Sequence, residues 1–185
     1  MGAIEARVDG EVDVIRLETR FSKAISYCAY AAVVDGLLID SGFVRAQEAL
    51  LRALEGRRIE QVVNTHAHED HFGNNREVAE RFGAEIAAPA AGLADIGRPQ
   101  TVAVLPYQRI LWGTPSPCRP APLGPVVRTR RFRFDVVPTP GHSSDHVCFH
   151  EPERGWLFAS RLISEAKQGR AWLGSWMGDH LGIPG

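Results

Sequence analysis

A short segment, residues 64–74, reads NTHAHEDHFGN and concentrates side chains that bind metal ions. His66 and His68 are two residues apart, so on an extended segment they project from the same side of the chain. Asp70 and His71 follow where a helix is expected to begin, and their side chains are expected to point into a space next to that of the first two histidines. Neutral imidazole is the commonest protein ligand for zinc and related ions. The order HxHxDH therefore predicts a metal centre, and a set of solvated loop histidines is the alternative.

A second stretch, TPGHSSDH at residues 139–146, contributes to the same concentration, since five of the seven histidines lie in these two segments. Asp145, His146 and His150 are candidates for a replacement ligand, although residues at such places more often structure a loop or lie on the surface. Cys148 lies in an apolar strand, which favours a core position over a ligand.

The elements that must position these residues can be predicted from hydrophobic periodicity. Alternation predicts a strand at 12–18, and 24–34 and 37–40 form a hairpin through Asp35-Gly36. Helical spacing predicts a helix at 43–55 that Gly56 ends, and a buried strand at 59–65 runs into the histidines. Asn74 with Glu77 predicts the cap of a helix at 75–82 that stops at Gly83, before a short strand at 84–88.

The second half of the sequence is less regular. Seven of the twelve prolines fall between Pro99 and Pro125, so residues 89–125 are predicted to form a long irregular loop. Strand patterns return at 126–140, 145–152 and 155–160. Strand–helix alternation followed by antiparallel strands predicts an α/β (α+β) protein with layered sheets and outer helices.

Composition narrows the function classes. A chain of 185 residues with 44% hydrophobic and 23% charged residues predicts a single domain spanning 1–185. The net charge of −1 makes nucleic acid an unlikely partner, and the basic run from Arg128 to Arg133 is expected to be a solvated strand face. Three cysteines without a pairing pattern suit a reducing compartment, and neither a signal peptide nor a membrane span is predicted. We therefore expect a cytoplasmic protein.

Three segments together resemble the metallo-β-lactamase-fold hydrolases: THAHEDHFGN, the downstream PTPGHSSDHV and the following ERGWLFAS. The likeness runs from about residue 12 to about residue 165 and includes the hairpin YAAVVDGLLIDSG. The resemblance implies an αββα sandwich, incomplete at the C-terminus of this sequence. It also implies hydrolysis of a small-molecule ester, thioester, lactone or amide by metal-activated water.

Carried over residue by residue, the resemblance assigns His66, His68 and His142 to a first metal. Asp70 and His71 would form half of a second site, and Asp70 would also orient or deprotonate the attacking water. One zinc ion is expected, and iron or manganese are the other ions that such ligands accept.

The sequence departs from the family pattern after its LF strand, where the family carries Gly-Asp and this chain carries Ser160 and Arg161. The family aspartate bridges two metals, whereas a guanidinium has no lone pair to offer. A second ion is therefore not expected, and Arg161 is predicted to pair with Asp70 in its place. Glu165 is not expected to reach the metal.

The absence of the family's last histidine ligand makes an impaired homologue, a binding scaffold or an inactive remnant, the alternative function. His180 is the only histidine after this point, and its surroundings do not match that ligand's. Uncovered apolar surface near the C-terminus would favour a homo-oligomer, to which Trp156, Trp172 and Trp176 could contribute, although core packing is the more ordinary role for tryptophan.

Overall fold

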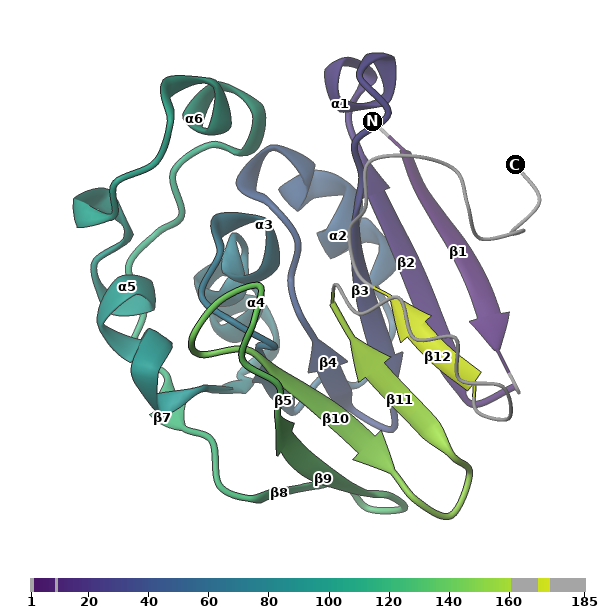
Figure 1. Ribbon diagram of the computed structural model, residues 1–185. Helices are drawn as coiled ribbons and strands as arrows, with labels where there is room; N and C mark the ends of the chain where they lie inside the picture. The colour runs from purple at the N-terminus through teal and green to yellow at the C-terminus, as the bar shows by residue number, and fades with distance from the viewer. Residues whose placement is uncertain (1, 9, 161–169, 174–185) are drawn as a thin grey trace.

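The computed structural model describes residues 2–8, 10–160 and 170–173, and the side chains of 10–160. Two sheets pack face to face (Figure 1). The larger sheet runs in the order β1 (Gly2–Val8), β2 (Val12–Glu18), β3 (Ala29–Val34), β4 (Leu37–Ile39), β5 (Gln61–Val63), β6 (Glu85–Ala88) and β7 (Ala121–Pro122). The smaller sheet runs β12 (Arg170–Leu173), β11 (Trp156–Ala159), β10 (Val147–Glu151), β9 (Arg133–Pro138) and β8 (Val126–Arg128).

Alternating side chains of the larger sheet build two cores. In β3, Ala32 and Val34 face the smaller sheet, whereas Ala31 and Val33 face the helices on the other side. Phe134, Phe149, Trp156 and Phe158 fill the space between the sheets from the opposite side. Trp156 is thus a core residue, which is the more ordinary of the two roles considered for it from the sequence.

Helices cover the outer face of the larger sheet (Figure 1). They include the short 3₁₀ turn η1 (Val44–Ala46), α2 (Gln47–Ala53) and α4 (Asn75–Phe82), whose apolar residues Leu50, Ala53 and Val78 pack against the strands. Within the described residues, the helices all lie between residues 20 and 112, so three layers of the sandwich are accounted for. This arrangement agrees with the predicted αββα architecture, of which the described residues form both sheets and one helical layer.

The histidine segment follows β5, which pairs in parallel with β4 and with β6. The carboxyl ends of these three strands therefore meet at one edge of the sheet, where ligands commonly bind in α/β proteins. The helix α3 (Glu69–Phe72) begins at this edge directly after His68.

The prediction of an irregular loop at residues 89–125 is wrong. This segment contains η2 (Ala90–Gly92), α5 (Leu93–Gly97), η3 (Pro99–Thr101), α6 (Pro106–Trp112) and β7. Pro99 and Pro106 occupy the first position of η3 and of α6, where the missing N–H costs nothing and the fixed φ favours the helix. The prolines therefore begin helices here rather than exclude them.

Several boundaries also differ from the sequence predictions. The strand expected from residue 24 begins at Ala29, because Thr19 caps the short helix α1 (Arg20–Ala24) through a capping box with Ser22. The helix expected at 43–55 is divided into η1 and α2. Asn74 does precede α4, but its side chain does not cap the helix: it donates to the carbonyl oxygens of Ser41 and Phe43.

The basic run at 128–133 is paired with acids, in agreement with a solvated strand face. Arg130 contacts Glu60 at 3.0 Å, Arg131 contacts Glu11, and Arg133 contacts Asp135 at 2.7 Å. Among the described residues, no helix is long and apolar enough to cross a bilayer.

Candidate active site

The fold brings the three predicted ligands of the first metal together. His66 and His68 lie in the loop after β5, and His142 lies in the loop between β9 and β10. Nε2 of His66 and Nε2 of His142 each lie 3.0 Å from Nδ1 of His68. One nitrogen from each ring falls within 4.8 Å of the others. A tetrahedral zinc ion separates its nitrogen ligands by about 3.3 Å, so this donor set fits such an ion with small adjustments.

The hydrogen bonds around His66 fix which of its nitrogens faces the other rings. Thr65 Oγ1 lies 2.8 Å from Oδ2 of Asp40, a carboxylate oxygen that can only accept, so the single hydroxyl proton goes to Asp40. Toward Nδ1 of His66, 3.1 Å away, the same hydroxyl can then only accept. His66 therefore carries its proton on Nδ1, and its Nε2 lone pair points at the cluster, which is the tautomer a metal ligand needs.

Asp70 and His71, on α3, lie beside the three histidines. The ring centroids of His66 and His71 are 4.2 Å apart, and both side chains are buried. Nδ1 of His71 donates to Asp40 Oδ2 at 2.8 Å, and its Nε2 lies 3.5 Å from Asp70 Oδ2. Asp70 Oδ2 also accepts a hydrogen bond of 2.6 Å from the hydroxyl of Tyr27.

Asp40 thus supports two predicted ligands at once. Its Oδ1 accepts from the backbone N–H of Thr65 at 2.9 Å, while its Oδ2 serves the Thr65 hydroxyl and His71. The residue directly follows β4 and adopts a positive φ of 58°, which aims its carboxylate across the sheet edge toward β5. Aspartate tolerates this conformation better than most residues.

The loop that carries His142 is anchored to the histidine segment at two points. Asp145 Oδ2 accepts from the backbone N–H of Ala67 at 2.8 Å, and the N–H of Val147 donates to the carbonyl of Thr65 at 2.9 Å. Gly92 approaches this junction so closely that a Cβ there would lie 2.5 Å from Asp145 Oδ2. Asp145 therefore structures the loop, in agreement with the more ordinary of its two predicted roles.

His146 occupies a buried position behind His66. Its Nε2 lies 2.7 Å from Ser160 Oγ, which is itself 3.4 Å from Nδ1 of His66. Its Nδ1 lies 2.7 Å from Thr139 Oγ1, which also contacts the buried Cys148 at 3.3 Å. His146 therefore supports the cluster from within the protein, and Cys148 is a core residue, as predicted.

The site favours neutral histidines. Burial lowers the pKa of His66 far below its usual value, and the neighbouring rings of His71 and His68 lower it further. Burial also lowers the pKa of His146. Imidazoles that stay neutral keep the lone pairs that a metal ligand requires.

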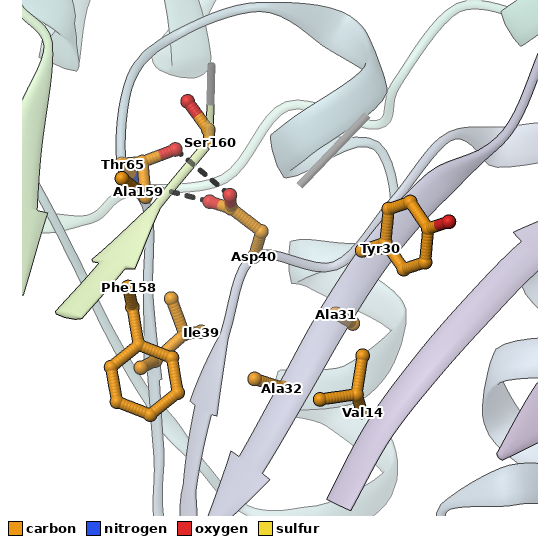
Figure 2. Close-up of a pocket in the computed structure, with 10 residues that line it drawn as sticks. All are labelled: Val14, Tyr30, Ala31, Ala32, Ile39, Asp40, Thr65, Phe158, Ala159 and Ser160. Atoms are coloured by element: carbon orange, nitrogen blue, oxygen red, sulfur yellow. Dashed lines mark hydrogen bonds between the residues drawn. The ribbon is translucent and has the colours of Figure 1, made fainter. Parts of the chain in front are cut away.

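A small cavity lies between the two sheets, with Thr65, the neighbour of His66 in sequence, in its lining (Figure 2). Asp40, Thr65 and Ser160 stand at its polar end, and Ile39 and Phe158 contribute apolar wall. Its volume of about 30 Å³ is of the order of a water molecule or two, too small for a substrate. The exposed side of the cluster, where His142 lies, is therefore the side open to a larger ligand.

The prediction that Arg161 pairs with Asp70 concerns a residue outside the described part of the chain, as do the predictions for Glu165, Trp176 and His180.

Sequence reasoning missed Tyr27, the supporting role of Asp40, and Thr65. Tyr27 is 43 residues from Asp70 in sequence, so no local pattern connects them. The hairpin YAAVVDGLLIDSG, which contains Asp40 and is part of the resemblance to the family, was the only sequence signal that pointed toward this residue.

Comparisons with known proteins agree on one family. A family model described as the metallo-beta-lactamase superfamily matches residues 34–183. The hydroxyacylglutathione hydrolase of Rhizobium meliloti (strain 1021) is 31% identical over 137 residues, which cover 70% of this chain and 44% of that protein. The same enzyme of Erythrobacter litoralis (strain HTCC2594) is 29% identical over 122 residues, covering 65% and 40%. The chain thus spans less than half the length of these relatives.

Two solved structures are similar in fold. A metallo-beta-lactamase from Cronobacter sakazakii gives a TM-score of 0.67 at 17% identity, covering 88% of this chain and 66% of that one. A metallo-beta-lactamase family protein from Thermus thermophilus gives 0.66 at 17% identity, covering 90% and 74%.

Proposed function

This chain belongs to the metallo-beta-lactamase superfamily, and from that premise we propose that it is a metal-dependent hydrolase of a small-molecule thioester. The observation that carries the proposal is the convergence of His66, His68 and His142. These side chains would hold one divalent ion, with zinc expected and iron or manganese as the alternatives. When bound, such an ion lowers the pKa of coordinated water and polarises a carbonyl group.

Asp70 is the proposed base. Its buried carboxylate is oriented by the Tyr27 hydroxyl at 2.6 Å and lies beside the histidines. In the reaction, the water oxygen bonds to the thioester carbon and Asp70 accepts the proton that this water loses. The carbon–sulfur bond then breaks, and the leaving thiolate takes the proton to give a thiol and a carboxylic acid.

Thioesters are preferred to esters, lactones and amides because the curated relatives are named hydroxyacylglutathione hydrolases. No feature of the described site favours the inactive-scaffold alternative, since the three first-metal ligands converge. The assignments of His71 to a second site and of the protein to the cytoplasm stay predictions, as does a homo-oligomeric state.

Metal content and hydrolysis test the proposal together. We expect about one metal equivalent per chain by elemental analysis, and hydrolysis of lactoylglutathione that a chelator abolishes and zinc restores. The double variant His66→Ala/His142→Ala should lose both, whereas His150→Ala, which alters a histidine on β10 outside the cluster, should lose neither. Protein that binds no metal after incubation with zinc, manganese and iron would overturn the proposal.

A further inference from the structure

Two buried asparagines stand at the ends of the segment that carries the histidines. Asn64 directly follows β5, and Asn75 is the first residue of α4. The two are 11 positions apart, and every predicted metal ligand except His142 lies between them. Both are almost completely buried, with 0% and 1% of their surface exposed. A buried amide is costly unless it is hydrogen-bonded, so the partners of these two side chains matter.

The two amides bind each other. Nδ2 of Asn75 donates to Oδ1 of Asn64 at 2.7 Å, and Nδ2 of Asn64 donates to Oδ1 of Asn75 at 3.3 Å. Nδ2 of Asn64 also donates to the carbonyl oxygen of His71 at 3.2 Å. Because a carbonyl oxygen can only accept, this bond fixes which side of the Asn64 amide is the nitrogen. The pair joins the two ends of the segment 64–75, and we call it the Asn64–Asn75 clasp.

Ser41 attaches the clasp to the loop that follows β4. Its backbone N–H donates to the carbonyl oxygen of His71 at 2.6 Å, and its hydroxyl donates to Oδ1 of Asn75 at 2.8 Å. The same hydroxyl accepts from the backbone N–H of Asn74 at 3.1 Å. The preceding residue, Asp40, accepts from the ring of His71. Two consecutive residues of one loop therefore hold the backbone and the ring of His71.

The segment needs this support because α3 is short. The helix has four residues, and the side chain of His68 does not cap it. A helix of this length is not stable by itself, since ordering the first turn costs more free energy than its hydrogen bonds return. Asp70 and His71 nevertheless lie on this turn, with the ring of His71 4.2 Å from that of His66. The turn cannot move away from β5 without breaking the buried bond from Asn64 to the carbonyl of His71.

We propose that the Asn64–Asn75 clasp is a positioning device that holds the histidine segment in its metal-binding conformation before an ion arrives. The inference rests on the proposed function for its metal and adds two positioning residues to it. Neither asparagine is a ligand, because both act through the backbone of the segment. When the clasp is opened, binding an ion must also order the segment, and this entropy cost reduces the affinity.

Zinc affinity tests the proposal. In Asn64→Ala and in Asn75→Ala, we expect zinc binding, measured by competition with a chromophoric chelator, to weaken by at least about tenfold. Because either change opens the same clasp, the double variant should lose little more than the single ones. Wild-type affinity in the single variants, or losses that multiply in the double variant, would overturn the proposal.

Asn75→Asp is a milder variant that keeps the size of the side chain. Its carboxylate still accepts from the Ser41 hydroxyl, but it cannot donate to Oδ1 of Asn64. Zinc affinity should fall here too, so the proposal stays testable if an alanine variant fails to fold. An Asn75→Asp protein that binds zinc as tightly as the unaltered chain would contradict the role of this bond.

Val78→Ala is the control for a general loss of stability. Val78 lies on α4 in the core beneath the helices, one turn after Asn75, and takes no part in the clasp. This change should lower the urea concentration at the unfolding midpoint, as the clasp variants do, but leave zinc affinity near its original value. If zinc affinity falls with stability in Val78→Ala as well, the clasp has no separate role and the proposal is overturned.

Hydrogen–deuterium exchange of the metal-free protein separates this inference from the proposed function. With a chelator present, peptides that cover residues 64–75 should exchange faster in the clasp variants, whereas peptides from α2 (Gln47–Ala53) should keep their original rate. Unchanged exchange in 64–75, or an equal increase in both regions, would overturn the inference. An unaltered protein that binds no zinc would count against the proposed function alone, because the exchange result decides independently whether the clasp holds the segment.

Discussion

The hydroxyl of Tyr27 donates a hydrogen bond of 2.6 Å to Oδ2 of Asp70. Tyr27 lies just before β3, and Asp70 lies on α3, so the bond joins the segment that leads into β3 to the helix that follows the histidine loop. The ring of Tyr27 also packs against Phe43 and Trp112. Packing thus holds the donor in place, and the donor holds the carboxylate that the proposed reaction needs.

Tyr27→Phe keeps the ring but removes this donor. We expect kcat to fall by about 10- to 100-fold with unchanged metal content, as is typical when a supporting hydrogen bond of a metal site is lost. The free energy of unfolding should fall by about 1.5–3 kcal/mol, the usual range for a hydrogen bond to a charged group. If Tyr27 acts through Asp70, Tyr27→Phe should reduce kcat little further in an Asp70→Asn background; additive losses would contradict this relationship.

Thr65→Val tests the tautomer of His66. Valine retains the shape of threonine but cannot accept the Nδ1 proton of His66 or donate to Asp40. Zinc affinity, measured by competition with a chromophoric chelator, should fall by about 10- to 100-fold. Thr65→Ser restores a hydroxyl at the same position and should recover most of the affinity. An unchanged affinity in the valine variant would mean that Thr65 does not orient this ring.

Gly92→Ala tests the junction that holds the loop of His142. The added Cβ would lie 2.5 Å from Asp145 Oδ2 and 2.7 Å from Cβ of Ala67, so the bond from the Ala67 N–H to Asp145 must shift. We expect the free energy of unfolding to fall by about 1–3 kcal/mol, and zinc affinity to weaken as His142 moves from His68.

Gly97→Ala is the matched control for this change. Gly97 ends α5, and the nearest atom to its added Cβ would be the carbonyl oxygen of Cys118 at an ordinary 3.8 Å. Stability and zinc affinity should both stay close to those of the unaltered protein. Equal effects of the two substitutions would show that replacing a glycine by alanine, rather than the contact at the junction, causes the loss of stability and zinc affinity.

The metal-free protein should lose stability as the pH falls below 6.5. Burial lowers the pKa of His66 and His146 in the folded state from the ordinary value of 6.5. Above pH 6.5 both states are neutral at these positions, whereas below it only the unfolded chain binds the protons. Each histidine can therefore contribute a slope of up to about 1.4 kcal/mol per pH unit.

Urea unfolding in the presence of a chelator, between pH 8 and pH 5, measures this slope. Glu69 acts in the opposite direction. Burial raises the pKa of its carboxyl group above the ordinary 4.5, so the folded protein binds this proton at a higher pH than the unfolded chain does. The contribution of Glu69 to stability therefore rises as the pH falls toward 4.5. The variant His146→Gln should reduce the slope, since one of the two histidines is then absent. Stability that stays constant from pH 7 to pH 5.5 would contradict the expectation.

Much of the fold and the ligand set could be predicted from the sequence because their signals are local. Alternation in Val12–Glu18 and the Asp35-Gly36 turn are properties of neighbouring residues, and β2 and the β3–β4 hairpin formed as expected. The positions of His66 and His68 are also a local property, because both residues follow β5 directly along the chain. The proline-rich segment was mispredicted because the same residue can begin a helix or interrupt one, and the local pattern does not distinguish the two.

Residue types and short spacings specify which side chains are available for metal chemistry. How these side chains are supported depends on contacts between distant segments: Tyr27 donates to Asp70, Asp40 accepts from Thr65 and His71, and Asp145 accepts from Ala67. These bonds join residues 25 to 78 positions apart. Their geometry depends on how the two sheets pack and on where the parallel strands end, which no short segment specifies.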